Sequence, residues 1–301
     1  MTEDTPTARK VAVIGTGRVG TAMAHLLSGK GYDVAAVSDV SREARERAAA
    51  LSGARALADA GVAAGLADII LITTPDDAIE DTCNEIARAP VGSDPGGALS
   101  GKKVIHMSGA LGLDALSAAS RAGADVLSVH PIQTFADVQG AERSLPGSTF
   151  GVTCEPGLEG WAGGFVASLD GRVLIVKDAD KVLYHAAAAV ACNLLAMVEY
   201  GAQAIMRGLG FADEQTSEAL LHLSAATVEN VARLGPAAAL TGPLARGDVG
   251  TLRAHMEALR AFAPDLAEMY RAVSLWGLRL VAEKGELPAE RIDEMRNVLE
   301  G

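Results

Sequence analysis

The sequence predicts an α/β protein in two parts: a doubly wound, mostly parallel sheet over residues 1–177 and an all-helical region over residues 178–301. Up to about residue 177, short β-branched runs alternate with helical patterns, which is typical of βα units in a parallel sheet. Beyond Ala179 the hydrophobic period is helical throughout. The chain has 301 residues, 49% of them hydrophobic, and is long enough for two domains.

The composition limits the possible partners. The formal net charge is −12, and acidic side chains outnumber basic ones in both parts, 21 to 15 and 17 to 11. Neither part therefore suits nucleic acid or an anionic membrane. The first nine residues lack the apolar core of a secretory signal, and no stretch approaches ~18 consecutive apolar residues, so we expect a soluble, cytoplasmic protein. Three cysteines without a CxxC pair indicate neither a disulfide framework nor a metal site.

A strand, a glycine turn and a helix follow one another at the start of the chain. The strand is Lys10 to Ile14, and the turn consists of Gly15, Thr16, Gly17, Arg18, Val19 and Gly20. In this context Gly15 allows the tight turn, Gly17 lets the backbone approach a pyrophosphate, and Gly20 lets helix and strand pack closely. The phosphates would lie at the helix N-terminus. The pattern predicts a Rossmann-type domain whose turn residues bind a dinucleotide.

The end of the second strand decides between the two nicotinamide cofactors. This strand, Asp33 to Val37, ends where a side chain can reach the adenosine ribose. Asp39 could accept a hydrogen bond from the free 2′-hydroxyl of NAD(H), whereas Ser38, Ser41 and Arg42 could hold the 2′-phosphate of NADP(H). We favour NADP(H) and leave NAD(H) open, because Arg42 fits nearly as well as a solvated residue of the following helix.

Polar residues follow three later strands of the sheet. Strands are expected over 68–73, 103–107 and 126–129, and two more over 149–152 and 172–176. The turns after the carboxyl ends of such strands line the ligand crevice of an open α/β sheet. We therefore expect Thr74, Pro75 and Ser108 beside the cofactor and His130 beside the substrate. Simple turn or capping chemistry is the alternative for each.

The second part of the chain is predicted to be a bundle of long helices. They are expected over 179–207, 212–234, 248–262, 265–284 and 288–299. Alanine-rich faces such as Ala186 to Ala191 permit close helix contact, and large helical domains often form subunit interfaces. We therefore expect a homodimer that forms through the helical domain.

The first of these helices carries the candidate catalytic residues. Lys181 and His185 are one helical turn apart, and Asn193 lies at the margin of the same stripe. A cation and an imidazole that project together could supply a proton, with either as the donor. The alternative is a buried interdomain helix whose polar residues satisfy one another.

One segment interrupts the helical region, at residues 239–248, and we expect a shaped loop there because it contains a Gly-Pro and a Gly-Asp pair. Thr241 is a hydroxyl donor, Arg246 could bind an anion and Asp248 could cap the next helix. The candidate substrate-binding residues of this loop are Thr241, Gly242, Pro243, Arg246 and Asp248. An ordinary helix connection is the alternative.

Five motifs together resemble a known family. They are GTGRVG at 15–20, SGA at 108–110, HPIQTF at 130–135, YHAAAAVACN at 184–193 and ALTGPLARGD at 239–248. That family of largely uncharacterised reductase-like proteins joins a Rossmann-like domain to a conserved helical domain. It is similar in plan to the 6-phosphogluconate dehydrogenase superfamily, including pyrroline-5-carboxylate reductase and ketopantoate reductase. The resemblance implies nicotinamide chemistry. The chain departs from ordinary ketopantoate reductases because His185, and not asparagine, stands four residues after Lys181.

Together these observations predict an NADP(H)-dependent oxidoreductase that reduces a small carboxylate-bearing 2-oxo acid or imine. Reduction needs a hydride donor on one face and a proton donor to the developing anion, and Lys181 or His185 would give the proton. Asn193 and Thr241 would orient the substrate, and Arg246 would pair with its carboxylate in an active site between the domains. Two alternatives remain: a non-catalytic NADP-binding regulatory or scaffold protein, and a deazaflavin-linked NADP oxidoreductase.

Overall fold

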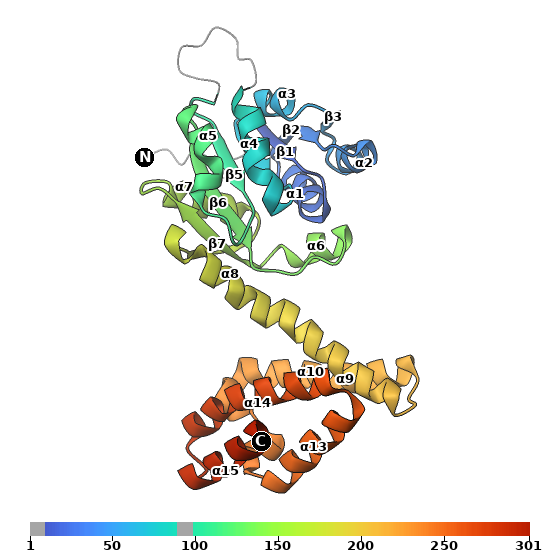
Figure 1. The fold of residues 1–301 in the computed structure, drawn as a ribbon. Helices are drawn as coiled ribbons and strands as arrows, with labels where there is room; N and C mark the ends of the chain where they lie inside the picture. Colours follow the sequence, from blue (N-terminus) through green and yellow to red (C-terminus); the bar gives the residue numbers. More distant parts are fainter. Residues whose placement is uncertain (1–9, 89–98) are drawn as a thin grey trace. The chain divides into compact units, whose positions relative to one another are not determined.

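The computed structural model describes residues 10–88 and 99–301 (Figure 1). The first nine residues, and most of the loop expected between residues 90 and 101, lie outside these ranges. The chain divides into two compact units, the first ending at Asn193 and the second beginning at Leu194. The boundary predicted at 177/178 lies earlier, at the start of a helical segment whose first turns pack on the first unit.

The first unit is built around an eight-stranded sheet with the order β3-β2-β1-β4-β5-β6-β7-β8. Its strands are β1 Lys10–Ile14, β2 Asp33–Ser38, β3 Arg55–Leu57, β4 Ile69–Ile72, β5 Lys103–His106, β6 Asp125–Pro131, β7 Thr149–Cys154 and β8 Arg172–Ile175. β7 runs antiparallel to β6, and every other neighbouring pair is parallel. The predicted mostly parallel sheet is confirmed. β3 was not expected, because this short edge strand has no apolar run.

Helices cover both faces of this sheet (Figure 1). They are α1 Arg18–Gly29, α2 Arg42–Ser52, α3 Ala60–Gly65, α4 Ile79–Arg88, α5 Ser117–Arg121, α6 Val138–Ser144 and α7 Glu159–Ser168. The last helix of this unit, α8 Lys181–Ala189, belongs to neither covering layer. Ile69 and Leu71 of β4 join a core with α1, α2, α6 and α7, whereas Ile70 and Ile72 join a second core with α3, α4 and α5. An apolar run buried on both faces is what a central parallel strand requires.

The second unit is helical. Its elements are α9 Leu195–Gly208, α10 Asp213–Leu234, α11 Pro236–Ala239, α12 Gly242–Arg246, α13 Val249–Phe262, α14 Pro264–Lys284 and α15 Ala289–Glu300. Leu252, Met256, Leu278, Val281 and Met295 form the centre of its core. The predicted all-helical region is confirmed. The loop expected at 239–248 contains the short helix α12, which has a proline in its first turn and ends at a glycine with φ of +68°.

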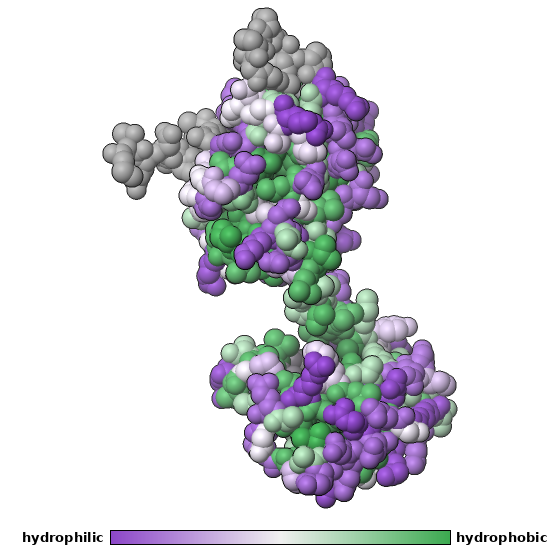
Figure 2. Space-filling model, turned by 60° about the vertical axis from the view of Figure 1, so that its left-hand side comes forward, coloured by the Kyte–Doolittle hydropathy of each residue, from purple (hydrophilic) through white to green (hydrophobic). Residues whose placement is uncertain are grey.

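The predicted helix over 179–207 is present but not uniform. After α8, the residues Val190–Leu194 form a π-helical turn that contains Cys192 and Asn193, and α9 continues from there. The whole segment Asp178–Gly208 is long and apolar enough to cross a membrane, and none of its most apolar window is buried. Figure 2 shows apolar surface along this segment. Polar residues interrupt it, so the sequence contains no long uninterrupted apolar run.

Candidate functional site

The glycine turn between β1 and α1 has the geometry of a phosphate cradle. Gly15 has a φ of +92°, and a Cβ there would lie 2.6 Å from the backbone nitrogen of Thr74. A Cβ at Gly20 would overlap the carbonyl oxygen of Gly15. A Cβ at Gly17 would meet nothing within 4 Å, and the helix that follows has no side-chain cap at its N-terminus. The turn therefore packs tightly against the residues after β4 through Gly15, while Gly17 and the uncapped N–H groups leave room for an anion.

Two threonines after β4 support this cradle. The Thr73 hydroxyl donates to the carbonyl oxygen of Gly15 at 2.5 Å and so holds the turn in place. The Thr74 hydroxyl is buried and has no hydrogen-bond partner among the described residues. A buried hydroxyl without a partner costs about 1–3 kcal/mol, so a ligand group that bonds to it would recover this cost. Pro75 follows and caps the short 3₁₀ turn Asp76–Ala78.

At the end of β2 the residues predicted to read the ribose have different surroundings. Asp39 accepts from the Thr16 backbone nitrogen at 2.6 Å and from the Thr16 hydroxyl at 3.2 Å, so its carboxylate clamps the glycine turn. Ser38 is only 2% exposed, which leaves its hydroxyl unavailable to a ligand at the surface. Arg42 is exposed and pairs with Glu46 at 2.6 Å.

Within the turn itself, the side chains of Arg18 and Val19 differ in exposure. The Arg18 side chain is exposed and donates to the carbonyl oxygen of Phe135 at 3.4 Å. Val19 is partly buried and packs against the core on that face of the sheet. Arg18 is therefore the exposed charged group of the turn, and Val19 fixes the turn to the core.

Lys181, the first residue of α8, is buried at the carboxyl edge of the sheet. Lys181 is only 1% exposed. Its ammonium group donates to the carbonyl oxygen of Ser108 at 2.9 Å and to the Ser128 hydroxyl at 2.6 Å. Burial lowers the pKa of Lys181 to about 8, although Asp178 and Asp76 act in the opposite direction. The lysine thus ties the start of α8 to the ends of β5 and β6.

Ser108 and His106 complete the surroundings of this cation. The Ser108 hydroxyl donates to Asp76 at 2.7 Å and accepts from the backbone nitrogens of Ala110 and Leu111, so its bonding capacity is used within the chain. Burial, together with the charge of Lys181, lowers the pKa of His106 to about 4. Its Nδ1 accepts from the Ser108 backbone, so Nε2 carries the proton and donates to the carbonyl oxygen of Gly112 at 3.2 Å.

Three aromatic rings meet beside this cluster. Nδ1 of His130 lies 2.7 Å from the Tyr184 hydroxyl, and the ring centroids of His130 and His185 are 5.8 Å apart. Two glycines make the contacts possible. A Cβ at Gly109 would lie 2.5 Å from Cδ2 of His185, and one at Gly151 would overlap the Tyr184 hydroxyl. The first turns of α8 therefore dock through Lys181, Tyr184 and His185 onto backbone that lacks side chains.

The structure brings together four of the predicted site residues: Lys181 and His185 from α8, Ser108 after β5, and His130 at the end of β6. Asn193 is exposed in the π-helical turn. The remaining substrate candidates lie in the second unit, where Thr241 and Arg246 are exposed and Gly242 and Pro243 form the first turn of α12. Asp248 caps α13 as predicted, because its carboxylate accepts from both the backbone nitrogen and the hydroxyl of Thr251.

Sequence reasoning missed several residues of this cluster: His106, Gly109, Ser128, Gly151 and Tyr184. Asp76, whose carboxylate accepts a hydrogen bond from the Ser108 hydroxyl, was not among the predicted site residues either. Some signals were present. Ser128 is a polar residue inside the apolar run at 126–129, and Tyr184 immediately precedes His185 within a motif already singled out.

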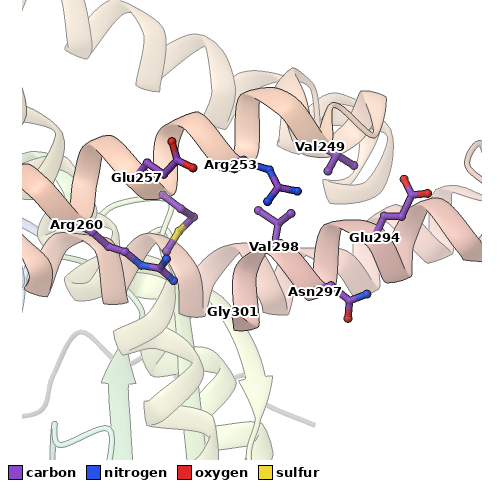
Figure 3. A pocket seen from close by; sticks show the side chains of 9 residues that line it. Val249, Arg253, Glu257, Arg260, Glu294, Asn297, Val298 and Gly301 are labelled. Carbon is purple, nitrogen blue, oxygen red and sulfur yellow. The ribbon is translucent and has the colours of Figure 1, made fainter.

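A pocket of about 530 Å³ lies elsewhere, in the second unit between α13 and α15 (Figure 3). Its charged lining includes Arg253, Glu257 and Arg260 of α13 and Glu294 of α15. These side chains are exposed, and no residue predicted to bind cofactor or substrate lines the pocket. We therefore place the candidate site at the carboxyl edge of the sheet.

Comparisons with solved structures show the same fold. BF3122 from Bacteroides fragilis, provisionally named an NADP oxidoreductase, is 20% identical over 89% of this chain and 97% of its own, with a TM-score of 0.73. An imine reductase from Pseudomonas sp. is 20% identical over 96% and 99%, with a TM-score of 0.63. The Plasmodium falciparum pyrroline carboxylate reductase with NADP bound is 13% identical over 97% and 98%, with a TM-score of 0.59.

Comparisons of the sequence identify both parts of the chain. Residues 2–131 match the model of a Rossmann-like domain, and residues 148–276 match DUF2520, a domain of unknown function. A search of curated proteins gives no match. The chain therefore joins a Rossmann-like domain to a DUF2520 domain, the combination that its motifs predicted.

Proposed function

We propose that this chain is an NADP(H)-dependent oxidoreductase that reduces the C=O or C=N bond of a small carboxylate-bearing 2-oxo acid or imine. The observation that carries the proposal is the meeting of two features at one edge of one sheet. The glycine cradle follows β1 and β4, and the cluster of Lys181, His130 and His185 lies where β5 and β6 end. The structural relatives named as an imine reductase and as an NADP-bound pyrroline carboxylate reductase support this chemistry.

The residues present fit the cofactor. Gly17 leaves open space at the N-terminus of α1, and the buried Thr74 hydroxyl has an unused bonding capacity in the described part of the chain. NADPH, when bound, supplies a hydride to the substrate carbon. The exposed Arg42 is the residue we propose to meet the 2′-phosphate, in exchange for its surface pairing with Glu46.

The chain supplies the proton that must reach the substrate oxygen or nitrogen as the carbon accepts the hydride. His185 is the more accessible donor, because it is partly exposed beside Gly109 and His130. Lys181 is the second candidate, with a pKa of about 8, but it is buried and two of its N–H groups are bonded within the chain. The donor then regains its proton from solvent. We keep Arg246, Thr241 and Asn193 as proposed substrate-binding residues.

A homodimer remains part of the proposal. Large apolar side chains are exposed on both α9 and α10: Met197 and Tyr200 on the first, and Leu221, Leu223 and Val228 on the second. A monomer rarely leaves so much apolar surface open, and a second copy of this chain would cover it. A membrane is the less suitable occupant, because Glu199 lies on the same helix and accepts from Ser224 of α10. Sedimentation of the purified chain as a monomer without detergent would contradict this part.

The test is oxidation of NADPH in the presence of a panel of 2-oxo acids and cyclic imines. His185→Phe and Lys181→Met should keep NADPH binding and slow turnover by about 10²-fold or more, as expected for loss of a proton donor. Gly17→Val should abolish NADPH binding without unfolding the chain, since a Cβ at Gly17 meets no atom within 4 Å. Gly164→Val, at an equally open position in α7, is its control.

Two outcomes would contradict the proposal. Saturable NADPH binding with no oxidation across the whole panel would favour a regulatory or scaffold protein. Reduction of a deazaflavin by NADPH, with none of the panel reduced, would favour a deazaflavin-linked oxidoreductase.

A further inference from the structure

His130 and Tyr184 form a hydrogen-bonded pair where α8 meets β6 and β7. Nδ1 of His130 and the Tyr184 hydroxyl oxygen are 2.7 Å apart, and the two rings meet edge to face at 89° with centroids 5.6 Å apart. Gly151 lies opposite His130 in the pairing of β6 with β7. Its missing side chain leaves the space that the tyrosine hydroxyl fills.

Both members of the pair are uncharged at neutral pH. Burial, followed by the charges of Lys181 and His185, lowers the pKa of His130 to about 4, against a smaller opposing effect of Asp76. Burial also raises the pKa of Tyr184 to about 12. The pair therefore consists of a phenol that keeps its proton and a neutral imidazole.

The direction of the hydrogen bond follows from the protonation states of the two rings. Tyr184 keeps its proton, and a phenol is a stronger donor than a neutral imidazole, so the Tyr184 hydroxyl donates to Nδ1 of His130. A neutral ring that accepts at Nδ1 carries its proton on Nε2.

Nε2 of His130 lies at the backbone of Gly109, in a ring that is only partly buried. A Cβ at Gly109 would lie 2.9 Å from Nε2 of His130 and 2.5 Å from Cδ2 of His185. Because glycine has no such atom, both rings can pack against this backbone side by side. A carbonyl or imine group that reaches the partly exposed His130 ring would meet its Nε2–H group with the ring of His185 close by.

We propose that Tyr184 is a positioning residue, which holds His130 as the Nε2–H tautomer so that His130 donates a hydrogen bond to the substrate carbonyl or imine. The inference rests on the proposed function, because it assigns the group that polarises the bond being reduced. A neutral donor suits this role, since it stabilises the charge that develops on the oxygen or nitrogen and does not compete as an acid with His185.

The chain contains its own control for this pair. In the second unit Nδ1 of His255 lies 3.0 Å from the Tyr270 hydroxyl, with ring centroids 5.8 Å apart at 85°. Nearly the same contact therefore exists on α13 and α14. Tyr270→Phe removes the same hydroxyl from the same kind of pair as Tyr184→Phe does.

The experiment joins ¹⁵N NMR of the histidine rings to kinetics on any substrate that the NADPH panel identifies. In the wild type we expect His130 as the Nε2–H tautomer, and in Tyr184→Phe a mixture of tautomers. The same variant should lower kcat about tenfold, the effect of one lost hydrogen bond, while the Kd for NADPH stays unchanged. Tyr270→Phe should change neither the His130 signals nor kcat.

The tautomer of His130 is measured without substrate, so this test can fail independently of the test of the proposed function. A wild-type His130 with its proton on Nδ1, or an unchanged tautomer in Tyr184→Phe, overturns the inference even if the chain proves to be a reductase. An altered tautomer with an unchanged kcat also overturns it, because Tyr184 would then position a ring that the reaction does not use.

Discussion

The two histidine–tyrosine pairs of this chain have similar geometry and very different surroundings. The pair of His130 and Tyr184 is set into the carboxyl edge of a parallel sheet, beside a buried ammonium group and two glycines. The pair of His255 and Tyr270 joins the surfaces of two helices, and His255 is exposed. A hydrogen-bonded pair alone therefore indicates no function. Burial, a fixed charge and a position at the carboxyl edge of the sheet are the features that suit the first pair for chemistry.

The largest effect of the buried surroundings of the first pair should be a loss of stability at acidic pH. His106 is fully buried, and its pKa is about 4 in the folded chain against 6.5 normally. The unfolded chain therefore binds more protons than the folded chain between pH 6.5 and 4. The neutral, buried ring contributes its whole share to the free energy of unfolding above pH 6.5, and this contribution falls as the pH drops toward 4. The expected loss is ~3 kcal/mol for His106, with a smaller loss from the partly exposed His130.

Urea unfolding at a series of pH values measures this loss. His106→Gln should flatten the dependence between pH 6.5 and 4, because it removes the titrating ring. Tyr270→Phe is the control, as it destabilises the second pair without removing a titrating group in this range. An equally steep acid loss in His106→Gln would mean that the burial of this ring does not govern acid stability.

The next largest effect on stability should come from the space beside Tyr184, which the first pair needs because Gly151 lies against the tyrosine hydroxyl. Gly151→Ala would place a Cβ on the Tyr184 hydroxyl and should force the tyrosine away from His130, at a cost of about 1–3 kcal/mol. Gly164→Ala, in open space on α7, should instead stabilise the chain by about 0.5–1 kcal/mol. Thermal unfolding of the two variants compares them directly. A Gly151→Ala variant as stable as the wild type would show that Tyr184 does not depend on that space.

The local parts of the fold were predictable from the sequence. β1 was expected over its observed residues, and the GxGxxG turn was expected between it and α1, because the strand, the glycines and the helix are adjacent along the chain. The buried run of β4 was recognisable because both faces of a central parallel strand are covered. β3 was not, since its three residues owe their conformation to pairing with β2.

The candidate site was predictable only where its residues share one helix. Lys181 and His185 were chosen because their spacing is local. Tyr184 was passed over, although it is three residues from Lys181, because its importance depends on His130 and Gly151, which approach it only through the pairing of β6 with β7. In the same way, the hydroxyl of Ser108 is occupied by Asp76, a partner 32 residues away that no local pattern reveals.

The smallest predicted effect isolates the charge of Lys181. The pKa of His130 is held at about 4 first by burial and second by this ammonium group, so Lys181→Met should raise the pKa of His130 but leave it below 6.5. Methionine keeps most of the side-chain volume, and the Ser128 hydroxyl remains as a donor to the Ser108 carbonyl oxygen at 3.3 Å. Histidine ring NMR followed over pH measures the change.

Lys284→Met is the matched control for that titration, because it removes an ammonium group that pairs with Glu286 in the second unit. It should leave the pKa of His130 at its wild-type value. If Lys181→Met also leaves that pKa unchanged, burial alone keeps His130 neutral, and the two histidine–tyrosine pairs differ in packing only. If the pKa of His130 rises, the buried lysine contributes to the site as a fixed charge as well as an anchor for α8. Its effect on turnover would then include the altered state of His130, and the loss in Lys181→Met could not be read as that of a proton donor alone.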